Sequence, residues 1–512
     1  MKLPINKLMC FGLVLLLLQV LLADCAGKEE KMVPENGAAL AAIYCASCHV
    51  LPQPSLLPKA TWEQYVLPRM GYMLGCYDQS AVRDSLFEKG MGGELVRQAN
   101  IFPKRPQISK EQWTSIKRYY LGLAPEALNF DQALPVNTSL PFFELKPAEV
   151  RLSPPGTTMV KIRREGGFLT GDANSRAFYQ FGQDGQLQDV ARVAEGTVQV
   201  DEFANDFLLT IMGSFSPTDA PSGMLLALPK DKSKQARVLI SQLQRPVHTS
   251  VADLDGDQQP DFVIAEFAKW TGKLSWWRLK DGKYMPTVLK KQTGAIRSVI
   301  TDLDGDGRSD VVALFGQGAE GIWVFYNRGD GNFEEEQLLN FPPTYGSSYF
   351  DMTDLDADGD LDIIYTNGDN ADYSPVLKPY HGIRFYYNEG NQHFEERFFY
   401  SLPGAYKAIP ADFDADGDLD IAAISFFPDF QRYPDRGFLF LENKGDYQME
   451  AFTFPESVDG RWLTMDAGDV DQDGDTDLIL GSLAFEVIPP TGILDQWVKK
   501  GMPFIILKNR LK

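Results

Sequence analysis

Five aspartate-rich stretches recur in the C-terminal part of this chain of 512 residues and constrain its fold more than any other feature. Their starts lie 49, 52, 58 and 57 residues apart, at residues 253–261, 302–310, 354–362, 412–420 and 469–477. An apolar, β-rich run follows each copy. Repeats of this length are typical of propeller blades. The mean spacing of 54 residues predicts an all-β propeller of about seven blades over residues 145–512, the first two without an aspartate loop.

Each loop carries aspartate at positions 1, 3, 5 and 9. Oxygen donors in that number suit Ca²⁺, and four carboxylates this close would repel one another without a cation. Glycine at position 6 permits the turn in four loops, whereas Gln258 replaces it in the first. The alternative is an exposed turn without metal. The predicted calcium ligands are Asp253, Asp255, Asp257, Asp261, Asp302, Asp304, Asp306, Asp310, Asp354, Asp356, Asp358, Asp362, Asp412, Asp414, Asp416, Asp420, Asp469, Asp471, Asp473 and Asp477.

A second motif, Cys45-Ala-Ser-Cys-His49, is the attachment pattern of c-type haem. Cys45 and Cys48 would form thioethers to the haem vinyl groups, and His49 would be the proximal iron ligand. The alternatives are a redox-active cysteine pair and half of a zinc site. A zinc site needs a second pair of ligands, and the whole chain has only five Cys and four His.

The sixth haem ligand is expected from a methionine, because thioether sulfur raises the reduction potential and suits electron transfer. Met70, Met73 and Met91 are the candidates in this region. We favour Met70, because it follows Pro68 and is expected on a turn rather than inside a helix. Cys76 is left over and is predicted to be a buried free thiol.

The haem motif lies in a segment expected to be helical. Residues 34–130 predict a small all-α cytochrome c-like domain, followed by a linker over residues 131–144. Ser109 and Gln112 form a predicted capping box for a helix that Pro125 ends. The chain is therefore predicted to be multi-domain, with the haem domain before the propeller.

The N-terminal residues are expected to be a targeting segment. Two lysines precede an apolar run from Leu8 to Leu22, which is short for a membrane span and typical of a signal peptide. Leu22-Ala23-Asp24-Cys25 resembles a bacterial lipobox. We therefore expect a signal peptide over residues 1–24, lipidation at Cys25, a tether over residues 25–33, and an exported outer membrane lipoprotein.

Charge is distributed unevenly along the chain. The formal net charge of −21 argues against nucleic-acid binding. Residues 31–130 carry a net +3, whereas residues 131–512 carry −24. This difference predicts a near-neutral haem domain joined to an acidic body.

The first part of the chain resembles c-type cytochrome domains fused to FG-GAP/VCBS-type propellers in bacterial envelope proteins. The matching stretches are Cys45 to His49, Trp62 to Gly75, Ala99 to Pro103 and Trp113 to Pro125. The aspartate loops resemble the calcium-binding FG-GAP loops of integrin-like propellers. The resemblance implies haem c on the first motif and calcium on the five loops, but no substrate, because propellers carry many unrelated functions.

A candidate ligand face follows from the repeat. Residues at one offset from each loop should share one orientation, at the end of the central channel opposite the aspartate loops. Long loops emerge on the same face, and one of them carries His381. A polar, partly cationic ring would suit an anionic or polyhydroxyl ligand; the alternative is ordinary channel polarity with water. Five residues before the loops stand His248, Arg297, Tyr349, Lys407 and Thr464.

Three functions are consistent with these sequence features. An envelope electron-transfer protein would use the cytochrome as a relay and the propeller to dock a redox partner or another envelope protein. A quinoprotein-like dehydrogenase would bind a small polyhydroxyl substrate. A surface lipoprotein would bind a glycan or a protein. Haem favours the first, because it supplies one-electron chemistry that adhesion does not need.

Overall fold

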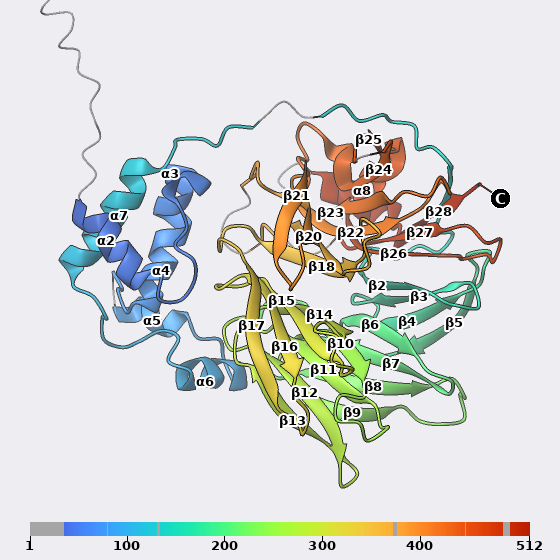
Figure 1. Ribbon diagram of the computed structural model, residues 1–512, viewed down its shortest axis with the longest axis horizontal. Helices are drawn as coiled ribbons and strands as arrows, with labels where there is room; N and C mark the ends of the chain where they lie inside the picture. Colours follow the sequence, from blue (N-terminus) through green and yellow to red (C-terminus); the bar gives the residue numbers. More distant parts are fainter. Residues whose placement is uncertain are drawn as a thin grey trace, which may run out of the picture.

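The computed structural model describes residues 35–78, 80–130, 134–371, 376–445, 447–484 and 492–511. The predicted signal peptide and tether, with Cys25, lie outside these residues. Figure 1 shows a group of N-terminal helices beside a large ring of β-sheets. Within the described part of the chain, no helix is both long enough and apolar enough to span a membrane.

The ring is a propeller of seven antiparallel sheets, each with four strands. This confirms the predicted all-β propeller and its blade count. Six blades are made of consecutive strands. In blade order they are β2 (Thr157–Ile162), β3 (Phe168–Asp172), β4 (Ala177–Phe181) and β5 (Leu187–Arg192); β6 (Thr197–Glu202), β7 (Asp206–Ile211), β8 (Gly223–Pro229) and β9 (Arg237–Leu243); β10 (Pro246–Ala252), β11 (Asp261–Glu266), β12 (Lys273–Lys280) and β13 (Lys283–Lys290); β14 (Ala295–Thr301), β15 (Asp310–Phe315), β16 (Gly321–Asn327) and β17 (Phe333–Asn340); β18 (Ser347–Thr353), β19 (Asp362–Asn367), β20 (Gly382–Asn388) and β21 (Phe394–Ser401); and β22 (Ala405–Ala411), β23 (Asp420–Ser425), β24 (Phe438–Asn443) and β25 (Met449–Phe452).

The seventh blade closes the ring with both ends of the propeller sequence. Its strands are β26 (Trp462–Gly468), β27 (Asp477–Ser482), β28 (Phe504–Asn509) and, outermost, β1 (Phe143–Pro147). Strand β28 pairs antiparallel with β1, with Leu507 opposite Leu145. The expected closure of the last strand against an early one is confirmed.

The first strand of each blade is innermost, and it contacts the first strand of the next blade. The second strands that follow the aspartate loops are buried along their whole length, because neighbouring blades cover both of their faces. Their apolar side chains fill the space between blades, as Val312 and Leu314 do between blades 4 and 5. This packing explains the apolar run after each loop. Short helices lie within blade 6, between blades 6 and 7, and within blade 7; in that order they are η3 (Pro434–Gly437), η4 (Pro455–Asp459) and α8 (Ile493–Lys500).

The N-terminal unit is built of short helices around its own apolar core. Helix α2 packs against α7, and Gly37 makes this approach possible, because a Cβ there would lie 2.6 Å from the Ser115 carbonyl oxygen. Ser109 and Gln112 form the predicted capping box at the start of α7. The elements are α2 (Glu35–Tyr44), η1 (Pro54–Leu56), α3 (Lys59–Thr61), η2 (Trp62–Val66), α4 (Leu67–Met73), α5 (Ser80–Ser85), α6 (Met91–Gln98) and α7 (Lys110–Leu123).

The helical unit contacts the propeller at the ends of the blades opposite the aspartate loops. The aspartate loops join first to second strands, whereas the contacted loops join second to third strands. The Glu88 carboxylate accepts hydrogen bonds from Thr218 Oγ1 at 2.8 Å and from the Asp219 N–H at 3.0 Å. Trp270 packs edge-on against Phe102, with ring centroids 5.3 Å apart. Blades 2 and 3 thus hold the region around α6.

Candidate functional site

The five aspartate loops each gather three carboxylates. In every loop the aspartates at positions 1 and 3 are joined by a third, and their ligand oxygens lie within 4.8 Å of one another. The third member is position 9 in three loops (Asp261, Asp362 and Asp477) and position 5 in the other two (Asp306 and Asp416). Such a group of hard oxygen donors fits Ca²⁺.

The aspartate at position 9 has a structural role besides its predicted role as a calcium ligand. Asp310 is fully buried, and its two oxygens accept backbone N–H groups from Leu303 at 2.9 Å and from Asn327 at 2.7 Å. The same pair of bonds recurs around Asp362, Asp420 and Asp477. These carboxylates therefore tie the loop to the end of the third strand. In blade 3 no asparagine ends that strand, and Oδ1 of Asp261 has no partner.

Backbone conformation supports the assignment of the loop glycines. The glycines at position 6 have φ between 85° and 100°, and Gln258 takes the same left-handed region at 66°. Position 4 is left-handed as well, which was not predicted from the sequence, and in three of the loops it is not glycine but Ala357, Ala415 or Gln472. L-residues adopt this region at a cost, so the loop shape is imposed by its bonds rather than by glycine alone.

The electrostatics of the loops favour a cation. Burial, with a contribution from Asp414, raises the pKa of Asp420 to about 7, although two backbone hydrogen bonds oppose the shift. Burial and Asp471 likewise raise the pKa of Asp477 to about 6. A bound divalent ion would favour the ionised carboxylates and counter both effects.

The loops differ in the protein cations beside them. Arg328 Nη1 lies 2.6 Å from Asp304 in blade 4, and Lys508 Nζ lies 3.3 Å from Asp473 in blade 7, where it also binds Asp471. In blade 3, Arg278 approaches Asp255 more distantly, at 3.8 Å. Among the described residues, no lysine or arginine forms an ion pair with the loop aspartates of blades 5 and 6.

The haem motif follows directly on α2. Cys45 is half-buried, Cys48 is exposed, and both are free thiols. Burial and the neighbouring Cys48 raise the pKa of Cys45 to about 11. His49 Nδ1 lies 2.8 Å from the Val50 carbonyl oxygen, which only accepts, so Nδ1 carries the proton and the Nε2 lone pair is left for a metal. Burial lowers the pKa of His49, which favours this neutral form. The donor set therefore fits a c-type haem.

The three methionine candidates lie in different surroundings. Met70 and Cys45 both pack against the core of the helical unit. Met73 packs instead in the cluster that includes Trp270 of the propeller, and Met91 is 60% exposed. Cys76 is only partly buried, less than predicted.

The expectation that Met70 lies on a turn was wrong, because it is inside α4. Pro68 stands in the first turn of that helix, where proline needs no hydrogen-bond partner. Gly71 allows the helix to approach Trp113, whose Cζ2 would lie 2.9 Å from a Cβ at that position.

The residues of the predicted ligand face do meet at the channel. Arg297 Nη1 lies 3.4 Å from His248 Nε2, and the Arg297 guanidinium stands 4.9 Å from the Tyr349 ring centre. The Lys407 ammonium is 5.2 Å from the same ring. Thr464 occupies the equivalent position in blade 7, and its buried hydroxyl has no partner. The shared offset therefore predicted a real cluster.

The ring is less cationic than its residues suggested. Arg297 donates to Asp351 at 2.9 Å, and Tyr349 donates to the same carboxylate at 2.8 Å. Lys407 donates to the Met465 carbonyl at 2.8 Å. Burial lowers the pKa of Lys407 to about 8. The acidic partner, Asp351, stands two residues after Tyr349 in β18, and Asp466 takes the same place in β26.

His381 lies outside this ring. It is 1% exposed on the loop between β19 and β20, and its ring stands edge-on to Tyr380 at 5.7 Å. Burial, Lys378 and Arg384 lower the pKa of His381 well below its usual value, so it is neutral. Its Nε2 has no hydrogen-bond partner.

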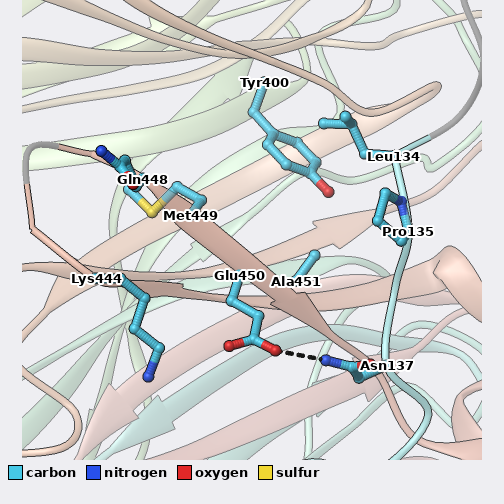
Figure 2. Close-up of a pocket in the computed structure, with 9 residues that line it drawn as sticks. All are labelled: Leu134, Pro135, Asn137, Tyr400, Lys444, Gln448, Met449, Glu450 and Ala451. Carbon is cyan, nitrogen blue, oxygen red and sulfur yellow. Dashed lines mark hydrogen bonds between the residues drawn. The ribbon is translucent and has the colours of Figure 1, made fainter.

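A groove of about 500 Å³ lies where the segment after the helical unit crosses the edge of blade 6 (Figure 2). Asn137 adds to the sheet edge, donating from its N–H to the Ala451 carbonyl at 2.9 Å and from its side chain to Glu450 at 2.8 Å. Leu134 and Met449 give the groove apolar walls. None of the predicted site residues lines it.

Comparisons with known proteins bear on the propeller. Residues 302–365 match the family described as FG-GAP-like repeat. A search of curated proteins found no match. Three solved structures are similar: virginiamycin B lyase from Staphylococcus aureus at 11% identity, a streptogramin B lyase at 12%, and a chain in an S. cerevisiae structure of Dbp5 bound to Nup159 at 10%. Their TM-scores are 0.44, 0.45 and 0.40; they cover 71%, 72% and 74% of this chain and 98%, 97% and 99% of their own. A seven-bladed propeller with an FG-GAP-like repeat over residues 302–365 suggests a binding or scaffold role.

Proposed function

We propose that this protein is a c-type haem electron-transfer protein of the bacterial envelope, whose calcium-stabilised propeller docks a partner or substrate. The arrangement at the end of α2 carries the proposal: two free thiols at the spacing of haem attachment, followed by His49 with its Nε2 available. Haem bound there would supply one-electron chemistry. Val50 holds the His49 tautomer, and Met70 is the favoured second axial ligand because it shares a core with Cys45.

The proposal is tested by purifying the protein from a host that matures c-type cytochromes. Haem should remain attached after denaturation. Met70→Ala should lose the methionine-to-iron absorption at the red end of the spectrum and keep the haem, whereas Met91→Ala, at an exposed position, should resemble the parent. A folded preparation without covalent haem would contradict the proposal.

Calcium is proposed as a structural ion of the aspartate loops. An ion that binds only the folded state stabilises it by mass action. Chelation should therefore lower the melting temperature of the propeller and leave the haem spectrum largely intact. A well-folded preparation in which elemental analysis detects no calcium would refute this role.

Attachment to the outer membrane through Cys25 is proposed from the sequence alone. Cys25→Ala should move the protein into the soluble fraction. Retention of the variant in the membrane would refute lipid anchoring at this cysteine.

A second candidate function is the binding of a glycan or a small polyhydroxyl compound, and the polar ring around Arg297 and Tyr349 favours it. Such a protein would bind its ligand equally well without haem. Ligand binding by a Cys45→Ala/Cys48→Ala variant, compared with the parent, distinguishes the two functions.

A further inference from the structure

Three aromatic side chains donate hydrogen bonds to backbone carbonyl groups of the segment that follows His49, at every second residue. The first two belong to the helical unit, and the third belongs to the propeller. The bonds are Tyr120 Oη to Pro52 O at 3.1 Å, Trp62 Nε1 to Pro54 O at 2.8 Å, and Tyr380 Oη to Leu56 O at 3.0 Å. The backbone that leads away from the predicted iron ligand is therefore supported partly from another domain.

Tyr380 is itself packed against other side chains of blade 5. Its ring stacks on Tyr345 with centroids 5.2 Å apart and meets the buried His381 edge-on. Its hydroxyl also lies 3.4 Å from the Thr344 carbonyl oxygen. Burial raises the pKa of Tyr380, so the phenol stays protonated and can donate. The propeller thus presents a fixed donor to the helical unit.

A second contact joins the helical unit to the propeller. Glu88 accepts from Thr218 and Asp219, and the Asp219 carboxylate in turn accepts the Trp270 N–H at 2.8 Å. Asp219 therefore organises both the polar contact with Glu88 and the loop that carries Trp270. The helical unit is fixed at blades 2 and 3 as well as at blade 5.

We propose that Tyr380 is a positioning residue of the haem site, through which the propeller holds segment 50–57 and with it His49. This inference rests on the proposed haem function. The haem unit and the propeller would then form one functional assembly, in which His49 is set partly by blade 5. The loop between β19 and β20, which also carries His381 and Lys378, then acts on the haem site through its contact with Leu56.

The test is Tyr380→Phe in the full chain, which removes the hydroxyl and keeps the ring. Hydrogen exchange of segment 50–57 should accelerate about five-fold, the factor expected from one hydrogen bond of typical net strength. Tyr326→Phe, elsewhere in the propeller, is the matched control and should leave this segment unchanged. In the haem-loaded protein, the midpoint potential or the visible spectrum should also change in Tyr380→Phe and not in the control.

The two proposals fail separately. If the parent protein carries no covalent haem, the proposed haem function is refuted. Hydrogen exchange of segment 50–57 would still test whether Tyr380 holds that segment. Unchanged exchange in Tyr380→Phe would overturn the positioning role, whether or not haem is present. Accelerated exchange with an unchanged potential and spectrum would overturn the link from Tyr380 to His49.

Discussion

Lys508 should weaken calcium binding at the blade 7 loop, because its ammonium already binds Asp471 and stands 3.3 Å from Asp473. A divalent ion on the same carboxylates would lie roughly 4 Å from this charge. At that distance two unit charges interact by about 1 kcal/mol in water, so a divalent ion is opposed by about 2 kcal/mol. Lys508→Met should therefore tighten calcium binding at this loop roughly 30-fold.

Calorimetric titration of the calcium-free protein at low ionic strength measures this change, since salt screens the effect. In the parent, the loops of blades 5 and 6 should fill first, because no protein cation pairs with their aspartates among the described residues. In Lys508→Met one further site should join the tight class. The matched control is Lys232→Met, since Lys232 pairs with Asp189 in blade 1, which has no aspartate loop. Equal affinities and stoichiometries in the parent and Lys508→Met would refute the reasoning.

Two further outcomes follow from the contacts. Trp270→Ala should weaken docking of the helical unit by about 1 kcal/mol, since the edge-on contact of this partly buried ring with Phe102 is lost. Hydrogen exchange in α6 should therefore rise, whereas the exposed Phe203→Ala should leave it unchanged. Burial lowers the pKa of Lys407 from 10.5 to about 8. Between those pH values the unfolded chain binds a proton that the folded chain does not, so stability should rise with pH. Denaturant melts of Lys407→Met should lack this rise, and an identical slope in the variant would contradict it.

The propeller could be predicted because its signal is repeated. Each aspartate loop marks one turn at one place in a blade, and the apolar run after it is the buried second strand. The spacing of the loops therefore predicted the number of blades, including two blades that have no aspartate loop. The ring of His248, Arg297, Tyr349 and Lys407 followed from the same logic, because equal offsets in equal strands give equal orientation.

Some contacts of the site residues were not predicted, because their partners lie outside the repeated aspartate loops. The position-9 aspartate binds the N–H of an asparagine at the end of the third strand, such as Asn327 for Asp310. That asparagine recurs in four blades, so an alignment of the repeats to one another would have found it. The contacts of the helical unit could not be found this way. Glu88 meets Thr218, and Tyr380 meets Leu56, once each and far apart in the sequence.

The aspartate loops lie at one end of the blades, the helical unit with the proposed haem motif lies against the other end, and blade 5 contacts that unit through Tyr380. Strand β19 begins at Asp362, which also binds the N–H of Asn388 at the end of β20. At their other ends the same two strands carry the loop with Tyr380, where Asn367 pairs with Gly382. An ion in the blade 5 loop would therefore brace the two strands that position Tyr380. Calcium should slow hydrogen exchange in segment 50–57 of the parent, and Asp356→Asn should abolish this response. Asp414→Asn, the equivalent change in blade 6, should preserve it, because no hydrogen bond among the described residues joins that blade to the segment. An equal loss of the response in both variants would show that calcium acts on the ring as a whole rather than through blade 5.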